Sequence, residues 1–209
     1  MNGVVTAAEA LKRLQEGNNR FVSGLGTRDL ALEHRRCREL ATEQAPFAIV
    51  LGCSDSRVPA ELVFDQGLGD LFVIRVAGNI VSPSQVGSIE FAADQFGTRL
   101  VVVLGHSQCG AIQASLAERD QPSGNRSPNL AFIVNSIMPV LDAVQPEPGE
   151  SRQALLARAV RENIDKLRAS GHPKWREVDL DAEVGIWELD SCSRVSPAAP
   201  PSKQGGRGG

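Results

Sequence analysis

The apolar residues of the chain gather in short, mostly unbroken runs at 47–51, 71–76 and 100–104. Runs of this length, rich in Val, Ile and Leu, are typical of strands buried on both faces of a parallel sheet. Because the stretches between and after them carry helix signals, the order along the chain indicates an α/β fold. We expect a mainly parallel sheet flanked by helices.

The clearest helix signal lies between the second and third runs. Ser82 provides an N-cap, Pro83 suits the first helical position, and Gln85 completes a capping box. The pattern predicts a helix that runs to Phe96 and ends at Gly97.

A second capping pattern lies near the N-terminus, where Thr6 is followed by Glu9. Apolar residues at helical spacing then predict an amphipathic helix at 7–16, an N-terminal helical arm that ends at Gly17. Weaker patterns predict helices at 110–116, 129–144 and 151–169, and an edge strand at 183–189.

The length favours a single domain, because 209 residues and 22.3 kDa fall near the usual upper size of one domain. We assign residues 1–195 to it, including the arm at 1–40. Residues 196–209 are rich in Pro and Gly and offer little to bury, so we expect a disordered C-terminal tail.

Composition excludes several classes of protein. With 22 basic and 25 acidic residues, the formal net charge is -3, which argues against general nucleic-acid binding. The apolar runs are far shorter than the roughly 20 residues that a membrane span needs. The first residues lack the pattern of a secretory signal, so we expect a cytoplasmic protein that does not bind membranes.

Two polar segments, at 53–57 and 106–109, directly follow the first and third predicted strands. Open α/β sheets place their ligand sites at the carboxyl ends of strands, so these segments are expected to meet at one edge of the sheet. Cys53, His106 and Cys109 then form a set of the thiolate and imidazole ligands that zinc prefers in proteins.

Each of these residues alone has an ordinary structural explanation, since a free cysteine is more often a small buried side chain than a ligand. Their joint occurrence at matching strand ends favours a metal site. His34 and Cys37 have the same H-x-x-C spacing as His106 and Cys109, but they lie in a strongly charged stretch, which we interpret as a solvated surface. Cys192 is interpreted as an incidental thiol.

The two polar segments carry the motifs C-x-D-x-R at 53–57 and H-x-x-C at 106–109, and the segment 64–70 lies between them. In these two motifs and this segment, the sequence resembles the β-class carbonic anhydrases. The resemblance extends from the arm at 11–21 to the segment 184–189. It implies an α/β sheet of four parallel strands with an added edge strand. It also implies an active site where two subunits meet, hence a homodimer or a dimer of dimers.

The resemblance also assigns roles to residues. Cys53, His106 and Cys109 would bind one Zn²⁺ per subunit, and Asp55 with Arg57 would form the catalytic pair. The substrate, carbon dioxide or bicarbonate, would contact three further side chains, those of Gln44, Phe72 and Ala77.

The implied function is the reversible hydration of carbon dioxide to bicarbonate and a proton, by attack of zinc-bound hydroxide. Asp55 would accept a hydrogen bond from the hydroxide, while Arg57 keeps the carboxylate ionised and away from the metal. Without that pairing Asp55 could become a fourth zinc ligand in a closed, inactive state. The alternatives are hydrolysis of carbon disulfide or carbonyl sulfide at the same site, a structural zinc module, and a thiol redox protein.

Overall fold

The computed structural model describes residues 5–26, 36–122, 124–150, 155, 158–159, 162, 181–187 and 196–197. Within this part of the chain, five strands form one sheet in the order β2-β1-β3-β4-β5. Their bounds are β1 Ala48–Gly52, β2 Leu71–Arg75, β3 Leu100–His106, β4 Asp181–Trp187 and β5 Ser196–Pro197. β2, β1, β3 and β4 are parallel and β5 is antiparallel, which confirms the predicted mainly parallel sheet.

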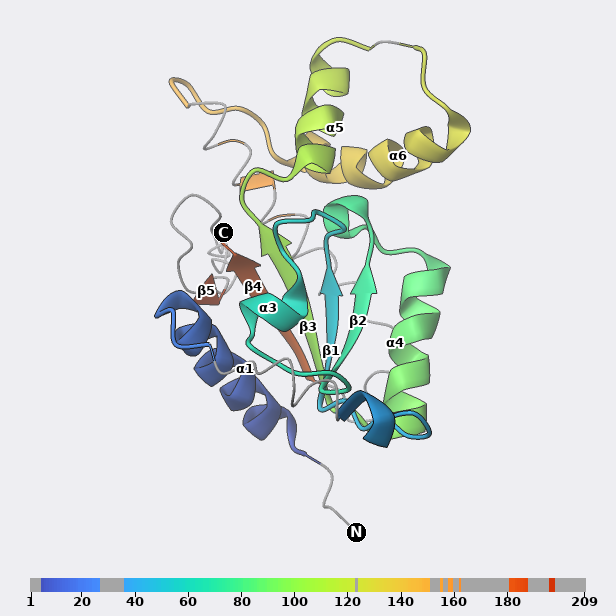
Figure 1. The fold of residues 1–209 in the computed structure, drawn as a ribbon. Helices are drawn as coiled ribbons and strands as arrows, with labels where there is room; N and C mark the ends of the chain where they lie inside the picture. Colours follow the sequence, from blue (N-terminus) through green and yellow to red (C-terminus); the bar gives the residue numbers. More distant parts are fainter. Residues whose placement is uncertain are drawn as a thin grey trace, which may run out of the picture.

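The helices are α1 Ala7–Val22, α3 Ala60–Val63, α4 Pro83–Phe96, α5 Gly110–Asp120 and α6 Pro128–Ala143, with the 3-10 turn η1 at Ala77–Asn79. Figure 1 shows α1 and α4 on either side of the sheet, and α5 and α6 beyond the arrowheads of the strands. The fold class is therefore the predicted one: a parallel sheet flanked by helices, with an N-terminal helix.

The alternation of side chains along β1 builds both faces of the core. Ala48 and Val50 pack in the cluster that contains residues of α1, whereas Ile49 and Leu51 pack in the cluster that contains residues of α4. All four side chains are buried. A strand that is covered on both faces needs apolar residues at successive positions, which is why this run has no polar alternation.

Helix α4 follows its prediction closely. It spans Pro83–Phe96, and the Ser82 N–H donates to Gln85 Oε1 at 3.2 Å in the capping box. Gly97 adopts a φ of 66°, the left-handed conformation that commonly ends a helix.

The end predicted for the N-terminal helix was wrong, because α1 continues through Gly17 to Val22. A Cβ at position 17 would overlap the carbonyl oxygen of Phe64, so the missing side chain allows a close approach between α1 and the segment after α3. Asn18 Nδ2 donates to the Val63 carbonyl at 2.9 Å and reinforces the contact. Gly17 is thus a packing position inside the helix.

The C-terminal predictions are described only in part. The expected strand at 183–189 begins earlier, as β4 Asp181–Trp187, and most of the expected helix at 151–169 lies outside the described residues. The predicted disordered tail at 196–209 lies outside the described residues except for Ser196 and Pro197, which pair with Ile186 and Gly185 of β4. Backbone groups at an open sheet edge can pair without a buried apolar side chain.

Among the described residues, no helix combines the length and the hydropathy that crossing a bilayer would require.

Candidate metal centre

The register of β1 and β3 brings the two polar segments together. Gly52 lies level with Leu104 in the parallel pair, so Cys53 leaves β1 beside the end of β3, which is His106. Cys109 follows after a tight turn and occupies the N-cap position of α5. The two Sγ atoms and a ring nitrogen of His106 lie within 4.8 Å of one another, and all three residues are buried. The predicted ligand set therefore converges.

The imidazole of His106 presents a free nitrogen to this cluster. Its Nδ1 lies 2.8 Å from the Ser107 carbonyl oxygen, and a proton on Nδ1 donated to that oxygen leaves the Nε2 lone pair available. Nε2 is buried and has no hydrogen-bond partner in the described part of the chain. A buried polar atom of this kind is expected to have a partner, and a metal ion provides one.

The two thiols are strongly coupled. The hydrogen bond from Cys109 lowers the pKa of Cys53 to about 4, and the same contact, with burial, raises the pKa of Cys109. Without a metal the pair therefore retains one proton over a wide pH range. A soft divalent cation can replace that proton, and two thiolates with one imidazole are a donor set that suits zinc and leaves a fourth position open.

Asp55 and Arg57 form a forked ion pair next to the cluster. Arg57 Nε donates to Asp55 Oδ1 at 2.8 Å, and Nη2 donates to Oδ2 at 2.7 Å. These hydrogen bonds hold the pKa of Asp55 well below its usual range. Nη2 of Arg57 also donates to the Gln108 carbonyl at 3.1 Å, which ties the pair to the loop between His106 and Cys109.

Arg75 is a further contributor that the sequence patterns did not reveal. It ends β2 level with Gly52, and its Nε donates to the Cys53 carbonyl at 2.9 Å. Its Nη2 donates to the Asp55 carbonyl at 2.6 Å. Arg75 thus supports the backbone that carries both residues. A charged side chain near the carboxyl end of a predicted buried strand is the signal that could have revealed it.

The three predicted substrate contacts do not lie together in one subunit. Ala77 begins η1 and precedes Gly78, whose N–H donates to Cys53 Sγ at 3.4 Å, so it lies near the cluster. Phe72 lies instead near the amino end of β2. Its ring is 6.2 Å from Phe91 and 6.0 Å from Phe96, both in α4.

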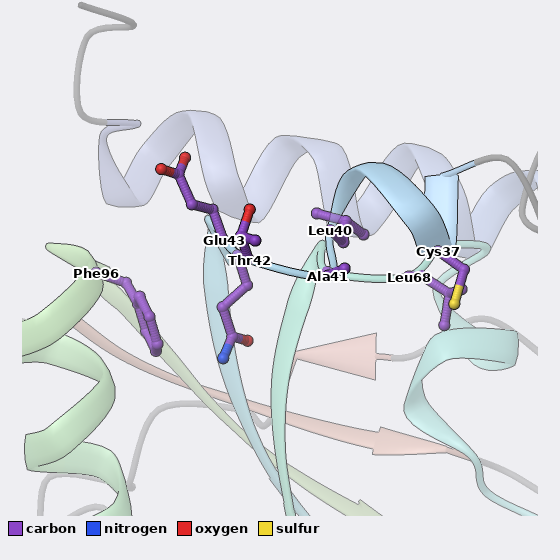
Figure 2. Close-up of a pocket in the computed structure, with 9 residues that line it drawn as sticks. Cys37, Leu40, Ala41, Thr42, Glu43, Leu68 and Phe96 are labelled. Atoms are coloured by element: carbon purple, nitrogen blue, oxygen red, sulfur yellow. The ribbon is translucent and has the colours of Figure 1, made fainter.

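Gln44 lies in the segment before β1 and lines an open groove of about 780 Å³. The other residues that line this groove are Cys37, Leu40, Ala41, Thr42, Glu43, Leu68, Gly69 and Phe96. Figure 2 shows labelled residues of this groove, from Cys37 to Phe96 at the end of α4. The groove therefore lies at the amino end of β1, whereas Cys53 follows its carboxyl end. Cys37 is exposed, as predicted, while His34 and Cys192 lie outside the described residues.

The sequence matches a protein family in the region that contains this site. A family model described as carbonic anhydrase matches residues 48–183, more than half of the chain. The chain belongs to the carbonic anhydrase family. The matched residues include the whole candidate metal centre, from Cys53 to Cys109.

Bacterial members of the family resemble the chain closely over part of its length. Carbonic anhydrase 2 of Mycobacterium tuberculosis is 50% identical over 109 residues, which are 52% of each protein. The carbonic anhydrase of Mycolicibacterium smegmatis is 48% identical over 118 residues, 55% of this chain and 57% of the relative. The matched part of the chain thus spans about half the length of these relatives.

Solved structures of β-class carbonic anhydrases match over most of the fold. The enzyme CafA of Aspergillus fumigatus superposes with a TM-score of 0.69 at 25% identity, over 93% of this chain and 92% of the other. CcaA superposes with a TM-score of 0.67 at 25% identity, over 91% and 99%. The fold and the ligand motifs therefore agree on the β class.

Proposed function

We propose that this protein catalyses the reversible hydration of carbon dioxide to bicarbonate and a proton, with one zinc ion bound per subunit. The observation that carries the proposal is the buried cluster of Cys53, His106 and Cys109 next to the Asp55–Arg57 pair. Membership of the carbonic anhydrase family supports it.

Cys53 Sγ, Cys109 Sγ and a ring nitrogen of His106 would hold the metal, because they are the donor atoms that converge. When bound, the zinc ion would act as a Lewis acid and lower the pKa of a coordinated water toward neutrality. Two thiolates offset the charge of the ion and weaken this effect. Residues around the ligands therefore have to orient the reacting groups and compensate.

Asp55 would orient the reacting water. Its carboxylate stays ionised at neutral pH, because Arg57 holds its pKa low, so it can only accept hydrogen bonds. An acceptor at this position directs the water hydrogen toward itself and leaves an oxygen lone pair to face the substrate. The fixed acceptor thus selects one orientation of the nucleophile.

Arg57 has a second task, which is to keep Asp55 off the metal. Carboxylate oxygen is itself a good zinc ligand, and Asp55 lies two residues from Cys53. Both of its oxygens accept hydrogen bonds from the guanidinium. Loss of these bonds would free Asp55 to become a fourth ligand in a closed state.

Gln44 and Phe72 would have to act in a second copy of the chain. Five residues of β1 separate the Gln44 groove from Cys53, and a strand rises about 3.3 Å per residue, so the two lie roughly 16 Å or more apart. A subunit that places its Gln44 groove over the metal centre of its neighbour would complete both sites. We therefore propose a homodimer, or a dimer of dimers, in which Ala77 acts from the subunit that holds the metal.

The proposed location is the cytoplasm. Two of the three ligands are thiolates, and the site functions only while Cys53 and Cys109 stay reduced, a condition that the cytoplasm maintains. Carbonyl sulfide and carbon disulfide are linear and small like carbon dioxide, so they remain the second candidate substrates.

The test is stopped-flow measurement of carbon dioxide hydration on purified protein of known zinc content. We expect a rate that rises above neutral pH, and we expect Cys109→Ser to lose both zinc and activity. Lys12→Ala is the control, because this side chain is exposed on α1, lies outside both the metal cluster and the Gln44 groove, and its loss should leave both unchanged. Full zinc occupancy without hydration would contradict the proposal; turnover of carbonyl sulfide instead would establish the second substrate class.

A further inference from the structure

The short turn η1 lies between the metal centre and the outer helices. Within it, Gly78 N–H donates to Cys53 Sγ at 3.4 Å. The next residue, Asn79, donates from Nδ2 to the Leu104 carbonyl at 2.6 Å. Leu104 lies two residues before His106 in β3. The turn therefore connects one thiol ligand to the strand that delivers the imidazole ligand.

The backbone of η1 has an uncommon conformation that is enclosed on its outer side. Gly78 has a φ of 71° and Asn79 a φ of 54°, both in the left-handed region. A Cβ at position 78 would lie 2.8 Å from Ile137 Cδ1 and 3.1 Å from the Ala111 Cβ. Packing against α5 and α6 thus limits movement of the turn away from the thiol.

The side chain of Asn79 contributes mainly through its donor group. The residue is 2% exposed, and its Oδ1 atom is buried without a hydrogen-bond partner among the described residues. A buried amide oxygen without a partner is unfavourable. Asn tolerates a positive φ better than most residues, and its amide reaches the Leu104 carbonyl. Both properties suit it to anchor this turn.

We propose that Asn79 is a positioning residue of the metal centre, which acts through Gly78 on the Cys53 thiolate. The anchor to Leu104 holds the Gly78 N–H on Sγ, and this hydrogen bond draws electron density from the thiolate. A thiolate that donates less leaves the bound metal a stronger Lewis acid. The inference rests on the proposed zinc function. It identifies Asn79 as a residue that, through the Gly78 N–H, reduces the electron donation of one of the two thiolates to the metal.

The test compares Asn79→Gly with Thr98→Val. Glycine adopts a positive φ readily, so the first variant keeps the backbone conformation and removes the anchor. Thr98 is the matched control, since it is buried and its Oγ1 donates to the Pro46 carbonyl at 2.8 Å, before the start of β3. Asn79→Asp, which has a similar volume but no amide donor, is the second variant if Asn79→Gly does not fold.

Zinc affinity is measured by competition with a chelator, and the donor strength of the thiolates by the charge-transfer absorption of cobalt-substituted protein. We expect the cobalt band of the Asn79 variants to shift to longer wavelength, because a thiolate without the held N–H donates more electron density to the metal. We expect them to bind zinc about tenfold or more weakly, because Sγ is then less well oriented and its proton competes better with the metal. Thr98→Val should change neither. Unchanged affinity and absorption in the Asn79 variants, or equal changes in Thr98→Val, would overturn the inference.

The same measurements separate this inference from the proposed function. If the wild type binds zinc and hydrates carbon dioxide, and the Asn79 variants have the same zinc affinity and cobalt absorption as the wild type, only the role of Asn79 is refuted. Wild-type protein that binds no zinc refutes the function on which that role rests.

Discussion

The guanidinium of Arg57 binds the carboxylate of Asp55 through two parallel hydrogen bonds, of 2.8 Å from Nε and 2.7 Å from Nη2. Both carboxylate oxygens are thus held by one side chain, although Arg57 is half exposed to solvent. A forked pair of this kind fixes orientation as well as charge.

Arg57→Ala should release Asp55 and let it bind the metal. We expect a loss of about 10- to 100-fold in kcat/KM for carbon dioxide hydration, the range typical for residues that orient metal ligands. A crystal structure of the zinc-loaded variant should show Asp55 as a fourth protein ligand. Lys12→Ala is the control, because its ion pair with Glu16 is exposed on both sides. A variant structure with three protein ligands and a water would contradict this prediction.

The ionisation of Asp55 predicts a pH dependence of stability. Its pKa in the folded protein lies below the ordinary value of 3.8, so the unfolded state binds the proton first as the pH falls. The stabilising contribution is therefore complete above about pH 5 and is lost as the pH falls below 3.8 toward the folded pKa.

This contribution is measured by urea unfolding of metal-free wild type and of Asp55→Asn from pH 3 to pH 7. The quantity compared is the difference between their free energies of unfolding at each pH, in which the titration of the thiols, common to both proteins, cancels. The difference should be constant in the neutral range and shrink in acid. A difference that grows as the pH falls would have the wrong sign for a lowered carboxyl pKa.

Gly17→Ala should destabilise the fold, because the new Cβ overlaps the Phe64 carbonyl. We expect a loss of about 1–3 kcal/mol in the free energy of unfolding, as for other overpacked positions. Gly87→Ala is the matched control. Gly87 lies within α4 with open space at its Cβ position, so alanine there should stabilise the helix by roughly 0.5–1 kcal/mol. Similar effects of the two substitutions in urea unfolding would refute the close approach of α1.

The proposed sharing of sites between subunits predicts complementation. Gln44→Ala and Asp55→Asn should each lower activity strongly when pure. After unfolding and refolding together, mixed dimers would contain one site with both residues intact, and about a quarter of the wild-type activity should return for a two-fold symmetric dimer. Refolding each variant separately before mixing is the control. No recovery in a mixture shown to contain mixed dimers would place Gln44 outside the site of its neighbour.

Features that depend on neighbouring residues could be predicted from the amino-acid sequence. The capping box of Ser82 and Gln85 and the stop at Gly97 bound α4 correctly, because these signals act within one turn of a helix. The apolar runs located β1, β2 and β3. β1 and β3 are buried at every position, as expected of strands covered on both faces, whereas β2 at the sheet edge is only partly buried. The ligand types at the ends of β1 and β3 followed from the same local pattern.

Contacts between groups far apart in the chain became visible in the folded protein alone. Gly17 looked like a helix end, and its packing role depends on the carbonyl of Phe64, 47 positions along the chain. The hydrogen bonds that Arg75 and Asn79 donate beside the candidate metal centre depend on strand register, which brings Gly52 level with both Arg75 and Leu104. Register and close packing arise from contacts between segments far apart in sequence, and a local pattern of residue types carries no record of those contacts.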